Sequence, residues 1–314
     1  MRVLRGKTLD TLKPMLSILI PVYNFDVQEL VKTLSQQAVV YGNPFEIIVV
    51  DDASSEKFRK ANQSLSSLPG VKYYEEPVNT GRSKIRNKLA DLARYDNLLY
   101  LDCDSKIESP EFIKRYMESL YQSDVVYGGR NYYNTFPNDQ RYLLHWLYGI
   151  KREQICVDER SKSPNKSFMT NNFIITREAI NRVRFNENIR GYGHEDTLFG
   201  YDLLKCNIMI KHIDNPVIHL GLEPGQEFLR KTKEGIKNLR KIMGINGNEK
   251  KLVEDITLLS YYKKVRSLGL RAFIAYLFRA NENRLQRNLM GSNPRLFLFD
   301  LYKLGYLCTL RSDR

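Results

Sequence analysis

Short apolar runs alternate with segments of helical periodicity along the first third of the chain, and this alternation limits the possible folds more than any other feature. Four of the runs are rich in β-branched and aromatic residues and are bounded by turn residues. We expect them to be strands, at Leu16–Val22, Phe45–Val50, Val71–Tyr74 and Leu98–Leu101. Strands that alternate with helices favour a mainly parallel sheet with right-handed crossovers. The sequence therefore predicts an α/β domain whose sheet is flanked by helices.

Acidic residues directly follow two of these predicted strands. Asp51 and Asp52 come after the second strand, and Asp102 and Asp104 come after the fourth. The carboxyl ends of parallel strands meet at one edge of a sheet, where open α/β proteins bind their ligands. Carboxylates are costly to bury unless they are paired or hold a metal, and oxygen ligands suit Mg²⁺ and Mn²⁺. The pattern favours a divalent-metal site at this edge, although Asp is also common in turns and helix caps.

The remaining segments predict more helices and strands, with a polar loop over Asp158–Lys166. The expected helices are Asp26–Tyr41, Gly81–Tyr95, Pro110–Tyr121, Tyr142–Ile150, Arg177–Val183 and a run from Glu195 to about Lys205. The expected strands are Val125–Tyr127, Asn172–Thr176, Met209–Ile213 and Val217–Leu220. Beyond Pro224, helices are expected over 226–243, Glu249–Lys264 and Leu268–Tyr276.

The net charge of +13 is unevenly distributed. Residues 225–314 carry 19 basic and 8 acidic side chains, whereas residues 1–224 are close to neutral. We therefore expect an α/β domain over 1–224 and a mainly helical, basic C-terminal extension over 225–314. Basic residues alternate there with Leu, Phe and Tyr, so the extension is either a packed cap with a solvated basic face or a surface that lies on an anionic membrane.

The sequence also bears on where the protein works. No apolar run approaches the roughly 20 residues that cross a bilayer, and the N-terminus lacks the continuous apolar segment of a signal peptide. The four cysteines have neither metal-site nor redox-motif spacing. These features favour a cytoplasmic protein with reduced thiols, which could also lie peripherally on the inner face of the cell membrane.

Five short segments carry a resemblance through their order along the chain. They are Pro21-Val-Tyr-Asn24, Val49-Val-Asp-Asp-Ala-Ser54, Asn79-Thr-Gly-Arg-Ser-Lys-Ile-Arg-Asn87, Leu101-Asp-Cys-Asp104 and Gly193-His-Glu-Asp196. Over Leu16–Leu220 the chain resembles the family 2 nucleotide-sugar glycosyltransferases, which are inverting enzymes of the GT-A fold, a Rossmann-like mixed and mainly parallel sheet. It is most similar to the branch with a Glu-Asp motif, which includes chondroitin polymerase and the catalytic domains of polypeptide GalNAc-transferases.

The resemblance implies a donor site for a nucleotide sugar, with a UDP-sugar as the expected donor. The residues implied for nucleotide binding are Pro21, Val22, Tyr23, Asp52, Arg86 and Asp102. Those implied for the divalent metal, Mn²⁺ or Mg²⁺, are Asp104 and His219. Helix capping is the alternative role for Asp52, and a purely structural role is the alternative for His219.

An inverting transfer needs a base that takes a proton from the acceptor hydroxyl, and the resemblance assigns this role to Asp196. Glu195 would be a second catalytic residue that holds substrate hydroxyls, with helix capping as the alternative for both acids. The residues implied for the acceptor and the donor sugar are Asn171, Asn172, Tyr192 and His194. Trp146 could stack on a sugar ring, and core packing is an equal alternative.

The function predicted in this way is transfer of a sugar to a hydroxyl of a glycan or lipid-linked acceptor, in bacterial surface polysaccharide synthesis, without a nucleic-acid partner. A sugar nucleotidyltransferase is one alternative, but it would need a glycine-rich basic loop after the first strand, which Pro21–Asp26 is not. A non-catalytic nucleic-acid-binding protein that uses the basic extension is the other, and it would not need the acidic residues.

Overall fold

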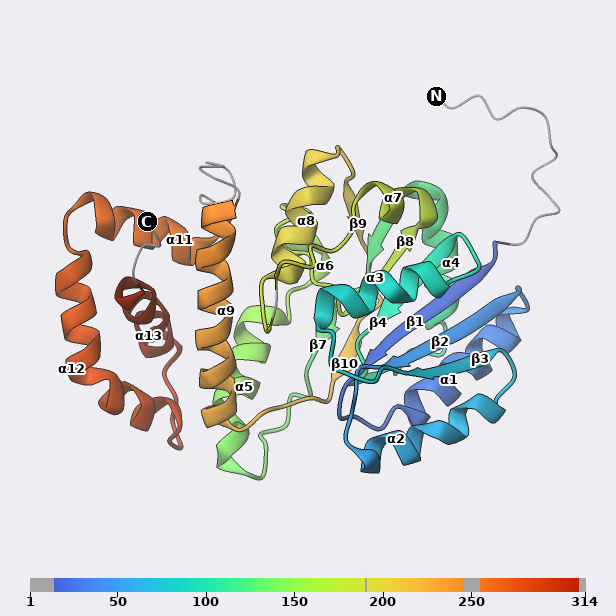
Figure 1. Cartoon of the computed structure of the whole chain (residues 1–314), viewed down its shortest axis with the longest axis horizontal. Helices are drawn as coiled ribbons and strands as arrows, with labels where there is room; N and C mark the ends of the chain where they lie inside the picture. Colours follow the sequence, from blue (N-terminus) through green and yellow to red (C-terminus); the bar gives the residue numbers. More distant parts are fainter. Residues whose placement is uncertain (1–13, 190, 246–254, 311–314) are drawn as a thin grey trace.

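The computed structural model describes residues 14–189, 191–245 and 255–310, and its centre is a seven-stranded sheet flanked by helices (Figure 1). The strand order is β3-β2-β1-β4-β8-β6-β9. The strand bounds are β1 Leu16–Val22, β2 Phe45–Asp51, β3 Val71–Glu75, β4 Asn97–Leu101, β6 Val125–Tyr127, β8 Asn172–Thr176 and β9 Ile210–His212. Strands β1 to β4 are parallel, which confirms the four strands predicted first. Strand β8 runs antiparallel between β4 and β6, so the sheet is mixed and mainly parallel, as predicted.

Helices connect the strands and make up the C-terminal part of the chain. In the first part they are α1 Gln28–Tyr41, α2 Glu56–Gln63, α3 Arg82–Leu92, α4 Phe112–Ser119, α5 Leu143–Tyr148, α6 Val157–Ser161, α7 Arg177–Arg182 and α8 Glu195–Lys205. Short 3₁₀ turns lie at Ser64–Ser67, Leu120–Gln122 and Gln140–Tyr142, and a π-helical turn at Gly149–Glu153 extends α5. The C-terminal helices are α9 Gly225–Ile245, α11 Thr257–Ser267, α12 Arg271–Leu289 and α13 Leu296–Thr309.

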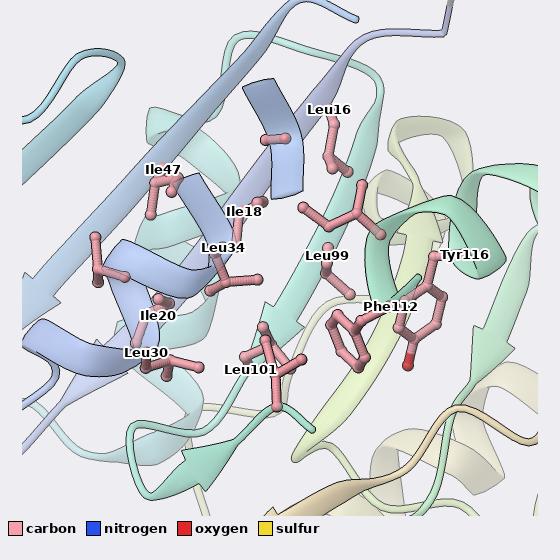
Figure 2. Close-up of a cluster of buried hydrophobic side chains, with 14 of the residues drawn as sticks. Leu16, Ile18, Ile20, Leu30, Leu34, Ile47, Leu99, Leu101, Phe112 and Tyr116 are labelled. Carbon is pink, nitrogen blue, oxygen red and sulfur yellow. The ribbon is translucent and has the colours of Figure 1, made fainter. Parts of the chain in front are cut away.

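The central strands are apolar on both faces because helices cover both sides of the sheet. On one face, Ile18 of β1 lies in a buried cluster with Leu34 of α1 and Phe112 of α4 (Figure 2). On the other face, Leu19 of β1 lies in a second cluster with Leu89 of α3. This packing explains why the strands appear in the sequence as continuous apolar runs and not as alternating ones.

The antiparallel direction of β8 brings its first residue to the edge at which the parallel strands end. Asn172 pairs with Leu101, the last residue of β4. The backbone N–H of Asp102 donates to the carbonyl oxygen of Asn171 at 2.9 Å. The polar segment before β8 therefore meets the acids that follow β4.

A second, three-stranded sheet, in the order β5-β10-β7, brings the later part of the chain to the same edge. Its strands are β5 Ser105–Lys106, β7 Arg130–Asn131 and β10 Val217–His219. Strand β10 is antiparallel to β5 and pairs His219 with Ser105. Because Ser105 follows Asp104 directly, this pairing brings His219 beside Asp104.

The helix predicted over Gly81–Tyr95 is wrong at its end, because α3 stops at Leu92. The N–H of Arg94 donates to the Glu46 carboxylate at 2.6 Å, and the N–H of Tyr95 donates to Ser17 at 3.1 Å. These distant side chains satisfy backbone donors outside a helix and lead the chain into β4.

The polar loop predicted over Asp158–Lys166 is also partly wrong, because residues 157–161 form α6. Arg160 of this helix is buried, and its guanidinium donates to the carbonyl oxygens of Gly128 and Ile213. The helix is therefore fixed by tertiary contacts that its own sequence does not reveal.

The C-terminal helices form a layer beside the sheet domain, with α9 between the domain and the other three (Figure 1). Helix α9 packs on α5 and α13, where Leu144, Phe228 and Phe299 share an apolar cluster. Part of the helix predicted over Glu249–Lys264 lies outside the described residues, and α11 begins at Thr257. Within the described ranges, no helix is long and apolar enough to cross a membrane.

Candidate active site

A cavity of about 650 Å³ opens at the carboxyl edge of the main sheet, and it is here called the donor cavity after the role that the resemblance implies for its residues. It is lined by residues from the ends of β1, β2 and β4 and from the start of α3. The residues implied for nucleotide binding that line it are Pro21, Val22, Tyr23, Asp52, Arg86 and Asp102, together with Asp104 of the implied metal pair. The structure therefore brings the implied nucleotide-binding residues together, although they are spread over more than eighty positions of the chain.

Asp52 lies on the wall of this cavity and fixes the loop that precedes α3. One carboxylate oxygen accepts from the N–H of Thr80 at 2.6 Å and from its hydroxyl at 2.8 Å, and the other accepts from the N–H of Gly81 at 2.9 Å. Gly81 has a φ of +88°, which favours glycine. Asp51 instead points inward and accepts from the N–H of Ser54 at 2.7 Å. Of the two acids, Asp52 is the one at the cavity.

Asp102 is surrounded by three guanidinium groups. Arg86 donates to it at 2.5 Å, while Arg82 and Arg130 lie 3.6 and 3.7 Å from its other oxygen. Arg86 is almost completely buried, and its charge is matched by Asp102. Arg86 therefore orients Asp102. The guanidinium groups of Arg82 and Arg130 are more exposed to the cavities than that of Arg86.

Asp104 and His219 form a pair beside Asp102. The Nδ1 atom of His219 lies 3.4 Å from one oxygen of Asp104. Burial alone would raise the pKa of Asp104, but His219, followed by Arg130 and Arg82, outweighs it and holds that pKa well below its usual range. Asp104 is thus an anion at neutral pH.

The residues around this pair fit a metal ion that takes its other ligands from substrate or water. The second oxygen of Asp104 and the Nε2 atom of His219 are buried without a hydrogen-bond partner. A Cβ atom on Gly221 would lie 3.0 Å from both Asp104 Cγ and His219 Cε1, so only glycine leaves this space open. In the part of the chain that the structure describes, no group of three or more His, Cys, Asp or Glu residues forms a complete metal cage. A substrate-bridged ion is the kind that such a two-residue site suits.

A second cavity of about 410 Å³ adjoins the first, and it is here called the acceptor cavity after the role that the resemblance implies for residues of its lining. Its lining includes Asn171, His194, Glu195 and Asp196. Four residues line both cavities: Arg82, Asp102, Tyr192 and Lys231. The acids predicted for metal binding and for base catalysis thus open onto two neighbouring spaces that share one wall.

The pKa values of the two acids at the start of α8 are shifted in opposite directions. Glu195 accepts a hydrogen bond from the Arg82 guanidinium, and although burial favours its neutral form, Arg82 outweighs burial and lowers the pKa of Glu195. Burial, with the charge of Glu195, raises the pKa of Asp196 to about 6. The N–H of Thr197 donates to Asp196 at 2.7 Å and holds the carboxylate in place. A carboxylate with a pKa near 6 is a stronger base than an ordinary one and is still ionised at neutral pH.

The predicted sugar contact of Asn172 is not supported, because its side chain lines neither cavity. It is fully buried, and its amide group donates to the carbonyl oxygens of Gly129 and Asn215 at 2.9 Å each. Trp146 also lines neither cavity, and its ring N–H donates to the carbonyl oxygen of Tyr133. These two residues are structural in their contacts, which for Trp146 agrees with the core-packing alternative.

The comparison with family models decides the classification. The model described as glycosyl transferase family 2 matches residues 17–186, more than half of the chain. The chain belongs to glycosyl transferase family 2. It carries a family 2 glycosyltransferase domain, and the predicted family is confirmed.

Two curated relatives of this glycosyltransferase are polysaccharide synthases. The hyaluronan synthase of Pasteurella multocida is 27% identical over 215 residues, which cover 59% of this chain and 22% of that protein. The chondroitin synthase of Pasteurella multocida (strain Pm70) is 27% identical over 245 residues, which cover 68% of this chain and 25% of that protein. The chain spans about a quarter of the length of these relatives.

Solved structures share the GT-A fold of this glycosyltransferase. A mannosyltransferase from Pyrobaculum calidifontis, in complex with GDP-Man and Mn²⁺, has a TM-score of 0.54 at 13% identity over 93% of this chain and 86% of that chain. Glucosyl-3-phosphoglycerate synthase from Mycobacterium tuberculosis, in complex with Mn²⁺ and UDP, has a TM-score of 0.50 at 15% identity over 74% of this chain and 79% of that chain. At these identities the likeness establishes the fold.

Four residues at the glycosyltransferase site were not predicted from the sequence. Arg82 and Lys231 line both cavities, and Arg130 and Glu153 line the acceptor cavity as an ion pair at 3.1 Å. Arg82 lies in the segment Asn79–Asn87, which carries part of the resemblance. Its position next to Gly81, at the start of a predicted helix, could have indicated a residue of the site. Lys231, Arg130 and Glu153 have no such signal, because each reaches the site through a tertiary contact.

Proposed function

We propose that the protein is an inverting, metal-dependent glycosyltransferase that moves a sugar from a UDP-sugar to a hydroxyl of a glycan or lipid-linked acceptor. The observation that carries this proposal is the shared wall of the two cavities. One cavity holds Asp104, and the other holds Asp196 as an elevated-pKa carboxylate. A donor and an acceptor bound on the two sides would meet at Asp102, Arg82 and Tyr192.

Asp196 would take the proton of the acceptor hydroxyl as that oxygen attacks the anomeric carbon. Its pKa of about 6 leaves it ionised at neutral pH and makes it a suitable base. The N–H of Thr197 fixes one oxygen, which leaves the other for the acceptor. Glu195 is held by Arg82 and stays an anion, so its role would be to hold hydroxyl groups and not to take a proton. A well-placed base contributes about 10²–10⁴-fold to the rate.

The residues that would hold a divalent metal are Asp104 and His219, with Gly221 leaving space beside them. When bound, Mn²⁺ or Mg²⁺ would act as a Lewis acid toward the diphosphate of the donor. Mn²⁺ occurs with a nucleotide in both fold relatives named above. The imidazole of His219 makes Mn²⁺ at least as suitable as Mg²⁺.

The choice of UDP rests on Asp52 and on the loop that contains Tyr23, which line the donor cavity. A carboxylate that accepts from a nucleobase N–H suits uracil, and the nucleotide in one fold relative is UDP. The polysaccharide synthases to which the chain is similar favour a glycan acceptor and a role in bacterial surface polysaccharide synthesis.

A transfer assay with a panel of UDP- and GDP-sugars tests this proposal. We expect release of UDP that depends on Mn²⁺ and on an added glycan, with product of inverted anomeric configuration by NMR. Release of GDP instead of UDP, or retention of configuration, would contradict the assignment. Calorimetry of UDP with and without Mn²⁺ separates donor binding from transfer.

We also propose that the enzyme works on the cytoplasmic face of a membrane and contacts anionic lipid through the corner between α11 and α12. The exposed apolar residues there are Leu268, Leu270, Phe273, Tyr276 and Leu277. Phe273 and Leu277 lie on one face of α12, and Leu270, the residue before the helix, precedes Phe273 by three positions. Three basic side chains flank them, those of Lys263, Arg266 and Arg279. All three are exposed, and none has an acidic partner in the described part of the chain. Apolar side chains bordered by unpaired cations suit an anionic bilayer surface. Flotation with vesicles tests this contact.

A further inference from the structure

The loop Gly191–His194 determines where the two acids of α8 point. Gly191, Gly193 and His194 have φ values of +80°, +92° and +69°. This left-handed backbone turns the chain sharply, places Tyr192 on the shared wall of the cavities and begins α8 at Glu195. Any change in the loop would therefore move Glu195 and Asp196 together.

One face of α9 covers this loop. Lys231, Gly235 and Asn238 are spaced by four and three residues, so they project from the same side of the helix. The ammonium of Lys231 lies 5.0 Å from the centre of the Tyr192 ring. A Cβ atom on Gly193 would come within 3.1 Å of the Cα atom of Gly235, so the two backbones are in close contact.

Asn238 makes the polar contacts of this interface. Its side-chain amide donates to the carbonyl oxygens of Tyr192 at 3.1 Å and of Gly193 at 3.4 Å. The side chain is buried and lines neither the donor nor the acceptor cavity. The two hydrogen bonds therefore hold the loop in the conformation in which both carbonyls face α9.

We propose that Asn238 is a positioning residue of the active site, which holds the Gly191–His194 loop so that Asp196 faces the acceptor. This inference rests on the proposed role of Asp196 as the base. It assigns a catalytic purpose to α9, which begins at residue 225, beyond the residues 17–186 that match the family model. In this enzyme the C-terminal helices would thus complete the site that the α/β domain begins.

The test compares Asn238→Asp and Asn238→Ala with the wild-type full chain. Both variants remove the amide donor, and Asn238→Asp keeps the shape of the side chain. We expect kcat to fall about 10²-fold, the loss that a displacement of roughly 1 Å can cause. The KM for the nucleotide sugar should change less than about twofold, because Asn238 does not line the donor cavity.

Asn215→Asp is the matched control. Asn215 is also buried, and its amide donates to a backbone carbonyl, that of Phe112 on α4, away from the loop and from α8. It should lower the melting temperature as much as Asn238→Asp does, with kcat nearly unchanged. If kcat falls equally in both variants, or in neither, Asn238 has no positioning role.

Hydrogen exchange of the backbone amides of 191–198 gives a second readout that needs no activity. The Asn238 variants should exchange faster there than the wild type, and Asn215→Asp should not. Unchanged exchange in the Asn238 variants would overturn the inference, whatever the kinetics. If the wild type transfers no sugar from any donor, the proposed function fails, while the exchange experiment still decides whether Asn238 holds the loop.

Discussion

The guanidinium of Arg82 donates to the carboxylate of Glu195, and this contact joins two loops that are more than a hundred residues apart in the chain. Arg82 begins α3 at the donor cavity, and Glu195 begins α8 at the acceptor cavity. The same guanidinium lies 3.6 Å from Asp102 and 5.7 Å from the centre of the Tyr192 ring. Donor side and acceptor side are therefore linked through one cation.

Removing this cation should impair both sides of the site. In Arg82→Met, Glu195 and Asp102 lose a charged partner, and a hydrogen bond to a charged group contributes about 1.5–3 kcal/mol. We expect kcat/KM for transfer to fall about 10- to 100-fold, with contributions from both kcat and the donor KM. Steady-state kinetics measure this. The control is Arg141→Met, which removes an exposed ion pair with Asp139 and should have little effect. A change in kcat alone would mean that Arg82 does not contact the donor side.

The elevated pKa of Asp196 predicts the pH dependence of transfer. The base acts only when ionised, so kcat should rise as the pH passes through about 6 and level off above pH 7. Asp196→Asn should lose about 10²–10⁴-fold in kcat while UDP binding by calorimetry stays near normal. A rate that is flat from pH 5 to 8, or an active Asn variant, would assign the base to another group.

The same carboxylate should destabilise the folded protein. Because the pKa of Asp196 is raised from 3.8 to about 6 on folding, the folded state binds its proton more tightly, and stability falls as the pH rises through this window. Asp196→Asn removes this effect. Its melting temperature should exceed that of the wild type at pH 8, and the difference should shrink as the pH falls below 6 and vanish below about pH 3.8. A lower melting temperature for the variant at pH 8 would show that burial does not strain this acid.

The residues that follow strands could be predicted from the sequence, because the position of a strand end fixes the position of the next side chain. Asp52, Asp102 and Asp104 lie at the predicted edge for this reason. The direction of β8 and the pairing of β10 with β5 could not be derived from apolar patterns, because strand direction depends on the whole topology. His219 was implied only by the resemblance.

Side chains that reach the site from helices were harder to predict. Lys231 lies in a basic segment in which many lysines have the same local surroundings, and only packing of α9 brings this one to Tyr192. Asn172 shows the opposite case. The resemblance implies both Asn171 and Asn172 for the sugar, but only Asn171 lines the acceptor cavity. The side-chain amide of Asn172 instead donates to the carbonyl oxygens of Gly129 and Asn215, contacts that depend on tertiary structure.

The corner between α11 and α12 predicts binding to anionic vesicles. The protein should float with vesicles that contain phosphatidylglycerol, bind neutral phosphatidylcholine vesicles less, and dissociate as salt screens the basic residues. Leu268→Asp and Phe273→Asp should reduce binding, since these side chains are 70% and 56% exposed. The control is Val40→Asp on α1, where the valine is 87% exposed and distant in the chain from this corner. The proposal is contradicted if the protein does not bind the vesicles, or if the two corner variants bind as well as the wild type. If the wild type instead forms a concentration-dependent dimer that these variants abolish, a second copy of the chain is the partner.

Gly221 offers a test of the metal site in which no proposed ligand is changed. A Cβ atom there would overlap Asp104, coming within 3.0 Å of its Cγ atom and of His219 Cε1. Gly221→Ala should therefore displace the Asp104–His219 pair and weaken Mn²⁺-dependent UDP binding about as much as Asp104→Ala does. Calorimetry of UDP with and without Mn²⁺ measures this. Gly225→Ala, at the start of α9, is the control, because a methyl group there meets its neighbours at ordinary distances of 3.4 Å or more. If Gly221→Ala binds UDP with normal Mn²⁺ dependence while Asp104→Ala does not, the space beside Gly221 is not needed for the ion, and this part of the metal site is wrong.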